Sequence, residues 1–128
     1  MQESHLYEYA VMRIMPRVER EEFLNTGVVL YCAKLKFLRA MCTVDHNRLL
    51  ALCSKIDLDA VEANCKAYQR ICAGAADAGP IGKMDMASRF RWLTAIRSTV
   101  LQSSKVHPGF CVDAEQTLSK LFNQLVLQ

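Results

Sequence analysis

Apolar runs predict three β-strands in the first third of the chain. Residues 7–15 carry apolar side chains on both faces, a pattern typical of a central strand that is covered on two sides. Pro16 has no N–H group for a strand ladder, so this strand is expected to end before it. Apolar and β-branched residues predict two more strands at 28–32 and 37–43. We therefore expect a three-stranded antiparallel sheet in this part of the chain.

The segments that connect these strands carry charged and turn-forming residues. Residues 17–24 form a charged connection with room for one helical turn. Asn25-Thr26-Gly27 predicts a turn immediately before the second strand. Residues 33–36 are short enough to form the loop of a β-hairpin.

Helical periodicity begins after the third strand. Asp45 and Asp57 each precede an apolar segment, and a carboxylate at that position accepts the free N–H groups of a first helical turn. The second helix carries one apolar stripe with alternating spacings of three and four residues, and Gly74 is expected to end it. Residues 74–82 are small and flexible, and they predict an exposed loop rather than a domain boundary.

The C-terminal third predicts two more helices, with a strand and a turn between them. Residues 85–96 have the spacing of a helix, and residues 98–103 are expected to form a fourth strand. Val106-His107-Pro108-Gly109 predicts a turn. Asp113 with Gln116 has the form of a capping box, and it precedes an amphipathic C-terminal helix.

This order of elements predicts an α+β protein. The expected architecture is a mainly antiparallel sheet of about four strands, with three or four helices packed largely on one face. A chain of 128 residues is long enough to bury a sizeable core, and residues 1–128 are expected to form a single domain.

Composition and charge narrow the classes of function and the compartment. Hydrophobic residues make up 52% and charged residues 23% of the chain, as in globular rather than disordered proteins. A net charge of +3, with a mild basic bias in residues 81–128, disfavours nucleic acid as a partner. No apolar run reaches the ~18 residues of a membrane span, and the polar N-terminus lacks a signal-peptide pattern. We therefore expect a cytoplasmic protein with no membrane partner.

Six cysteines stand out in the composition, but their spacing carries no strong signal. No two of them form the C-x-x-C pair that zinc and redox motifs use. Free cysteine is among the most buried residue types, so we interpret them as small buried hydrophobic residues in a reducing compartment. A metal site and a reactive thiol are the alternatives. The six are Cys32, Cys42, Cys53, Cys65, Cys72 and Cys111.

One long run resembles a known family closely. It extends from Tyr9 to Tyr31 and includes Asn25-Thr26-Gly27. The segments 89–93 (Arg-Phe-Arg-Trp-Leu) and 106–109 (Val-His-Pro-Gly) add to the likeness. Over about residues 7 to 127, the chain resembles the small bacterial proteins catalogued as domain of unknown function 3037. The family usually has valine where this chain has Thr26, and threonine keeps the β-branched shape.

The resemblance implies a partner rather than a reaction. The family has no established activity. Its members are often encoded beside a protein that looks like a HipA-type serine/threonine kinase. A kinase-like protein is therefore the partner that the resemblance implies.

The first candidate site surrounds an arginine in the first predicted strand. Arg13 interrupts an apolar run, and a guanidinium is costly to bury unless it is paired. Glu19 or Glu22 on the following loop can fold back to pair with it. Alternatively, Arg13 and Arg17 remain free to hold a phosphate or carboxylate. The mixed charges of this loop are typical of a self-paired, solvated surface, but its carboxylates also suit acid–base or metal chemistry.

The second candidate site is a cationic and aromatic cluster in and after the predicted helix 85–96. Arg89 and Trp92 are expected to share one flank of that helix, while its apolar side chains face the core. An arginine beside an exposed tryptophan can stack on bases or receive an acidic partner helix. Trp92 is equally compatible with an ordinary core or rim position. The cluster consists of Arg89, Arg91, Trp92 and Arg97.

No recognisable catalytic set accompanies these clusters. His107 precedes Pro108 and Gly109, and it is a candidate ligand-binding residue as well as an ordinary hydrogen-bonding residue of a loop. The chain has no H-E-x-x-H pattern, no Walker-type phosphate loop and no G-x-S-x-G elbow. No cofactor or metal is predicted, and the sequence leaves open whether the protein is an enzyme.

Two functional hypotheses follow. The first is a non-catalytic cytoplasmic module that binds another protein through the loop at 13–25 and the arginines of 89–97. The second is a binder of, or an enzyme acting on, a phosphorylated or nucleic-acid ligand in an arginine-lined cleft. The sequence favours the first hypothesis, and it is also compatible with a homodimer.

Overall fold

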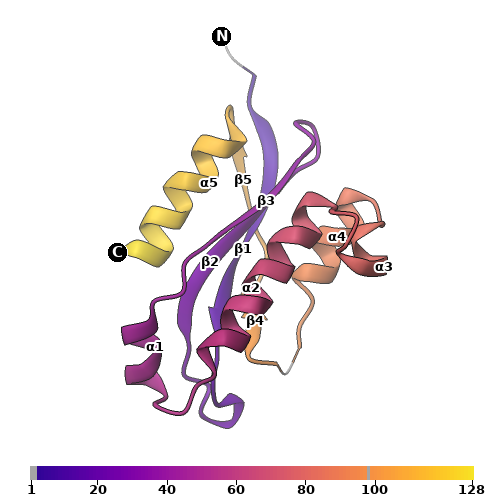
Figure 1. Cartoon of the computed structure of the whole chain (residues 1–128). Helices are drawn as coiled ribbons and strands as arrows, with labels where there is room; N and C mark the ends of the chain where they lie inside the picture. The colour runs from indigo at the N-terminus through magenta and orange to yellow at the C-terminus, as the bar shows by residue number, and fades with distance from the viewer. Residues whose placement is uncertain (1–2, 98) are drawn as a thin grey trace.

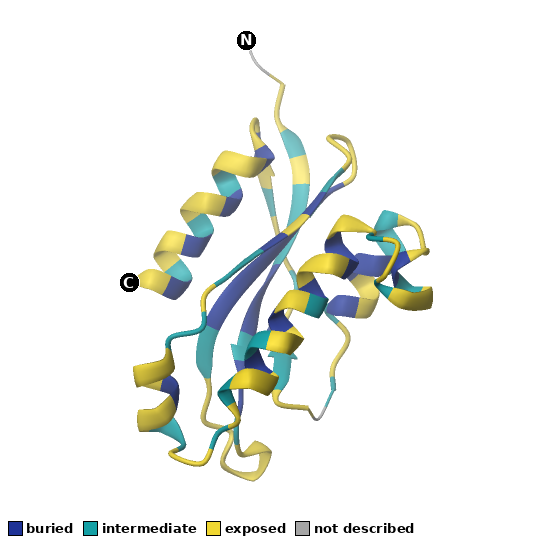
Figure 2. Cartoon of the chain, viewed as in Figure 1, coloured by how far each residue is buried: buried dark blue, intermediate teal, exposed yellow. Residues whose placement is uncertain are grey.

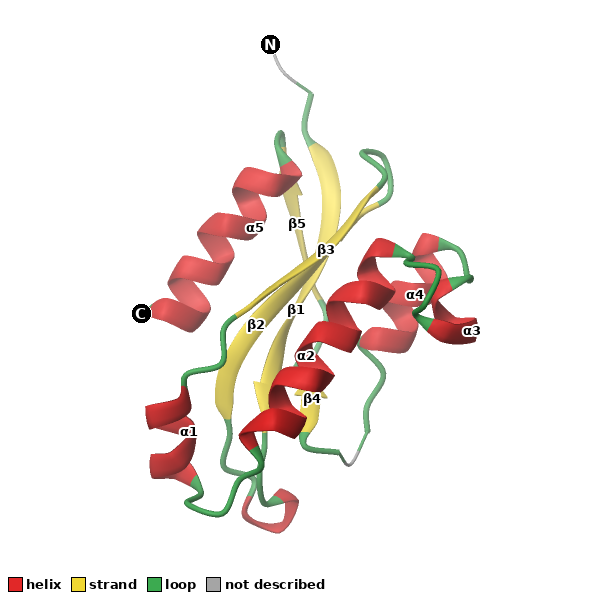
Figure 3. Cartoon of the chain, viewed as in Figure 1, coloured by secondary structure: helices red, strands yellow, loops and turns green. Residues whose placement is uncertain are grey.

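The computed structural model describes residues 3–97 and 99–128, and its five strands form one antiparallel sheet (Figures 1 and 3). The strands follow the order β3-β2-β1-β4, and β5 also pairs with β1. The predicted α+β fold is therefore confirmed. The strands are β1 (His5–Ile14), β2 (Leu24–Cys32), β3 (Phe37–Cys42), β4 (Leu101–Ser103) and β5 (His107–Cys111).

Strand β1 is an inner strand of the sheet, as β2 is, and it pairs with three other strands. One edge pairs with β2, and the other pairs with β4 at residues 12–14 and with β5 at residues 5–9. Ser104 fills the gap between β4 and β5. Its N–H donates to the carbonyl of Val11 at 2.9 Å, and its Oγ accepts the N–H of Val11 at 2.8 Å. β4 and β5 therefore act as one interrupted edge strand, and the sheet is as wide as predicted.

The turn predicted at residues 106–109 is wrong, because most of this segment belongs to β5. Pro108 pairs with Glu8 on the outer edge of the sheet, where a proline can be accommodated without a ladder hydrogen bond. A Cβ atom on Gly109 would lie 2.5 Å from the Tyr7 ring. The glycine therefore allows a close cross-strand contact rather than a turn. The strand predicted at 98–103 begins at Leu101 in the structure. Residue 98, the first residue of the predicted strand, lies outside the described residues.

The turn predicted at residues 25–27 is also wrong, because these residues form a β-bulge inside β2. The register between β1 and β2 shifts beyond Met12, and Thr26 is the extra residue. Thr26 is buried, and its hydroxyl donates to the carbonyl of Thr43. A Cβ atom on Gly27 would lie 2.5 Å from a backbone oxygen of β3, so only glycine fits beside the bulge.

Helices cover both faces of the sheet (Figures 1 and 2). α2 (Leu58–Ala73) and α4 (Met86–Leu93) pack on the face that includes Ala10 and Met12 of β1. α5 (Ala114–Phe122) packs on the opposite face. The predicted preference for one face therefore holds for the middle helices but not for the last one. The remaining elements are the 3₁₀ turn η1 (Val18–Arg20), α1 (His46–Leu52), α3 (Gly79–Gly82) and the π-helical turn η2 (Asn123–Leu127).

The starts predicted for three helices and the end predicted for α2 are confirmed by their caps. Asp45 and Asp57 accept a first-turn N–H group of α1 and α2 at 3.1 and 3.0 Å. Asp113 does the same for α5. Gly74 ends α2 with a φ of +66°, a left-handed conformation that glycine adopts without strain.

The helix predicted at 85–96 is shorter, because α4 ends at Leu93. The loop predicted at 74–82 is partly wrong, because it includes α3 with Pro80 in its first turn. In the described part of the chain, no helix is both long enough and apolar enough to cross a membrane.

Ser104→Ala is expected to lower the free energy of unfolding by about 1–3 kcal/mol, because the buried N–H of Val11 loses its acceptor. Urea denaturation followed by circular dichroism measures this loss. Ser103→Ala is the matched control. Its hydroxyl donates only to an adjacent carbonyl, and we expect a change below about 0.5 kcal/mol. Equal losses in the two variants would contradict the proposed bridging role of Ser104.

Candidate functional site

The charged loop between β1 and β2 is paired within itself. Nε of Arg17 lies 2.9 Å from Oε1 of Glu19, and Arg20 pairs in the same way with Glu22. Both ion pairs are exposed to solvent. Two hydrogen bonds lower the pKa of Glu19 below its ordinary value. The larger effect comes from a backbone hydrogen bond and the smaller one from the side chain of Arg17. The hydrogen bond from Arg20 likewise lowers the pKa of Glu22.

Arg13 pairs with neither of these glutamates. Its Cζ atom lies 4.2 Å from the ring centroid of Phe23, a cation–π contact. Its Nε atom is buried and has no hydrogen-bond partner among the described residues, and the same is true of Oδ1 of Asn25, its neighbour across the bulge. Nδ2 of Asn25 donates to the carbonyl of Leu125 at 3.1 Å, which ties β2 to the C-terminal helix. Asn25 therefore joins the bulge to η2, while Arg13 packs on Phe23.

Arg89 is a buried structural residue. Its Nε donates to the carbonyl of Met84 at 3.0 Å, and its Nη1 donates to the carbonyls of Ile71 and Cys72 at 2.9 and 2.7 Å. The guanidinium therefore binds carbonyl groups at the C-terminal end of α2. The expectation that Arg89 and Trp92 form one cationic and aromatic surface is wrong, because Arg89 is buried whereas Trp92 is exposed.

The other members of the cationic cluster lie apart. Nη1 of Arg91 lies 3.1 Å from Oε2 of Glu8 on β1. Cζ of Arg97 lies 4.0 Å from the ring centroid of Trp92 and its Nη2 donates to the carbonyl of the same residue. His107 lies on the exposed edge strand, with its ring 5.4 Å from that of Tyr9. The structure thus brings together Trp92 and Arg97, but not the whole predicted set.

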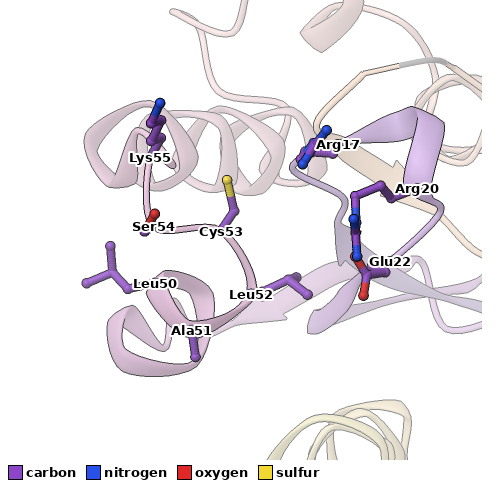
Figure 4. Close-up of a pocket in the computed structure, with 9 residues that line it drawn as sticks. All are labelled: Arg17, Arg20, Glu22, Leu50, Ala51, Leu52, Cys53, Ser54 and Lys55. Carbon is purple, nitrogen blue, oxygen red and sulfur yellow. The ribbon is translucent and has the colours of Figure 1, made fainter.

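A cavity of about 890 Å³ lies between the charged loop and residues 50–55, which are the end of α1 and the start of the segment that links it to α2 (Figure 4). Arg17, Arg20 and Glu22 line it from the loop, opposite residues 50–55. Lys55 adds a third cationic side chain to its walls. Sequence reasoning did not identify Lys55, because only the fold brings the end of α1 beside a loop more than thirty residues earlier.

Two further cavities lie along α2. A cavity of about 210 Å³ shares Cys53 and Lys55 with the first one. It also shares Asn64 and Val100 with a cavity of about 400 Å³ that reaches Trp92. We call these three adjoining cavities the α2 groove. Its wall on α2 includes small or short side chains on a single flank, namely Ala60, Asn64 and Ala67.

The cysteines are free thiols, and most of them are buried as predicted. Burial raises the pKa of Cys72 to about 12. A hydrogen bond with Cys65, together with burial, raises the pKa of Cys42. Cys53 is half-buried, as Cys42 is, but it differs from Cys42 and Cys72 because it lines the α2 groove. Among residues 3–97 and 99–128, no three histidine, cysteine, aspartate or glutamate side chains are grouped as a metal site.

These features define an α+β protein with a partly cationic groove beside its longest helix. The chain belongs to the family described as "Protein of unknown function (DUF3037)", whose model matches residues 9–126. The resemblance noted in the sequence is therefore confirmed over nearly the whole chain. Comparisons with curated proteins and with solved structures gave no match.

Arg89→Met is expected to lower the free energy of unfolding by about 2–4 kcal/mol, because three backbone carbonyls lose a charged donor. Arg91→Met, two residues away on the same helix, removes only an exposed ion pair and is expected to cost less than about 1 kcal/mol. Chemical denaturation of the two variants and the unsubstituted protein makes the comparison. A larger loss for Arg91→Met would contradict a structural role for Arg89.

Cys53 is expected to react with iodoacetamide at pH 8 faster than Cys72 does. Thiolate is the reactive species, and a thiol with a raised pKa stays protonated at this pH. Peptide mass spectrometry after timed alkylation of the native protein measures both rates. Cys53→Ser should remove the fast phase, and a fast phase that survives this substitution would contradict the assignment.

Proposed function

We propose that the protein is a non-catalytic module that binds another protein, and that the α2 groove is its contact surface. The observation that carries this proposal is a set of three cavities in which neighbours share lining residues, two of them lying along one flank of α2. Exposed apolar side chains lie beside them, including Leu50, Trp92 and Val100. Large apolar side chains that remain exposed beside a concave surface are typical of protein interaction sites.

The dimensions of the groove support a polypeptide segment as the bound group. Its wall on α2 extends from Asp57 to Tyr68, which corresponds to a length of about 16 Å at the helical rise per residue. A small phosphorylated ligand would instead need several unpaired cations around one compact pocket. Arg17, Arg20 and Lys55 do share one cavity, but a glutamate of the charged loop already pairs with each of the two arginines. Arg97 lines a different cavity.

The acid–base alternative receives less support from the loop carboxylates. The pKa values of Glu19 and Glu22 are lowered, so both groups are ionised at neutral pH. A general acid needs a carboxyl group whose pKa is raised toward neutrality. The two carboxylates therefore suit ion pairing better than proton donation.

The proposed partner is the kinase-like protein whose gene often accompanies those of the family. In this proposal the chain acts as a single cytoplasmic domain, residues 1–128, and docks on that protein through the α2 groove. A homodimer is the competing assembly, and light scattering during size-exclusion chromatography separates the two outcomes by mass.

Co-expression of the protein with its kinase-like neighbour is expected to yield a complex that survives size-exclusion chromatography at micromolar concentration. Val100→Asp places a charge in the groove and is expected to weaken the complex at least about tenfold, or about 1.4 kcal/mol, in isothermal titration calorimetry. Phe110→Asp is the matched control, because Phe110 is 73% exposed on β5 and lies outside the groove. No complex with the unsubstituted protein, or equal weakening by both variants, would count against the proposal.

A further inference from the structure

The two ends of the α2 groove differ in chemistry. The 890 Å³ end is lined by three cationic side chains and one carboxylate, that of Glu22. The 400 Å³ end is lined by Tyr68, Trp92 and Leu93, with Arg97 stacked on the tryptophan ring. A bound segment that matches both ends carries negative charge at one end and apolar side chains at the other.

The arginines at the cationic end are occupied only by weak internal partners. Each is held by a glutamate two residues further along the same loop, and both pairs are exposed to water. Exposed ion pairs of this kind add little to stability, because water and salt screen them. A carboxylate from another protein can therefore replace Glu19 on Arg17 or Glu22 on Arg20 without disturbing the fold.

We infer that the α2 groove binds an extended acidic segment of the partner, with its carboxylates on Arg17, Arg20 and Lys55 and its apolar side chains near Trp92. This inference rests on the proposed function and specifies the partner's chemistry. Arginine offers a planar fork that matches a carboxylate with two parallel hydrogen bonds. Glu19 and Glu22 then act as internal competitors that occupy the arginines while the groove is empty.

The length of the segment follows from the groove. An extended chain advances about 3.3 Å per residue, so about five residues fit along the α2 wall. The wider cationic end has room for about three more residues, so the bound segment is expected to contain about eight residues. Three of the cationic side chains of the groove lie at one end, whereas a nucleic acid carries a phosphate at every nucleotide and a peptide can carry its charges at one end only. The observations therefore favour an acidic peptide over an oligonucleotide.

Internal competition predicts that two kinds of substitution act in opposite directions. The double variant Arg17→Ala, Arg20→Ala is expected to bind an acidic peptide about tenfold more weakly, because two positive contacts are lost. The double variant Glu19→Gln, Glu22→Gln is expected to bind it about threefold more tightly, because the arginines are released. A misfolded protein cannot produce the second result.

The ion pair of Arg39 with Glu115 supplies matched controls. Its atoms lie 2.8 Å apart, and the Arg39 side chain is 55% exposed, against 57% for Arg17. None of the three cavities of the α2 groove includes this pair. Arg39→Ala and Glu115→Gln are therefore expected to leave peptide binding unchanged, although they change net charge by as much per substitution as the groove variants.

Fluorescence anisotropy with a labelled peptide of about eight residues tests the inference. The probe carries glutamates in one half and leucine and phenylalanine in the other. Control arms use a glutamine-for-glutamate peptide and a single-stranded oligonucleotide. Four results together support the inference. The arginine variant binds more weakly, the glutamate variant binds more tightly, the Arg39 and Glu115 controls bind as the unsubstituted protein does, and high salt weakens binding.

Other results overturn it. The inference is contradicted if the acidic peptide does not bind or if the glutamine peptide binds equally well. It is also contradicted if the protein prefers the oligonucleotide or if the glutamate variant binds no more tightly. The unsubstituted protein and the four variants are also tested for complex formation with the kinase-like protein. A complex that forms equally with all five, while the peptide fails to bind, overturns only the acidic-segment inference. Loss of complex formation with the unsubstituted protein overturns the proposed function itself.

Discussion

Backbone pairing along both edges of β1 is the constraint on which the rest of the structure depends. Buried N–H and C=O groups need partners, and β1 is an inner strand of the sheet with helices over both faces. On one edge Thr26 is inserted as a bulge, and on the other Ser104 bridges a broken strand. Both irregularities fall beside residues 11–13 of β1. Bulges increase local twist, and Figure 1 shows a strongly twisted sheet with α2 and α5 on its two sides.

The elements that the sequence predicts correctly are those specified by local chemistry. An aspartate that accepts N–H groups three residues later, a glycine in a left-handed conformation and an apolar stripe all act within one or two helical turns. The two wrong turns have a different origin. Glycine is needed at positions 27 and 109 because a neighbouring strand or an aromatic ring approaches the backbone closely. In the sequence, a glycine required by such a contact cannot be distinguished from a glycine that forms a turn. The face that α5 covers is also set by distant parts of the chain.

In the candidate site too, local pairings could be predicted from the sequence and contacts between distant segments could not. Arg17 and Glu19 are neighbours in sequence, so their pairing is among the alternatives that charge patterning predicts. Arg89 is different, because its acceptors include carbonyls at the end of a helix that precedes it by seventeen and eighteen residues. Nothing in the local pattern distinguishes it from Arg91, which is exposed. The sequence did not predict Lys55 as a site residue, because a single lysine after a short helix resembles any surface lysine. Only the fold shows that it lines a cavity.

The contact between Arg97 and Trp92 gives the groove an optical property. Trp92 is the only tryptophan in the chain, and it is 38% exposed at the apolar end of the groove with a guanidinium over its ring. Its emission therefore reports on one defined place in the molecule, without any label. Whatever enters the groove there changes the polarity around the indole or displaces the cation. The protein thus carries its own fluorescent sensor at the surface where we place its partner.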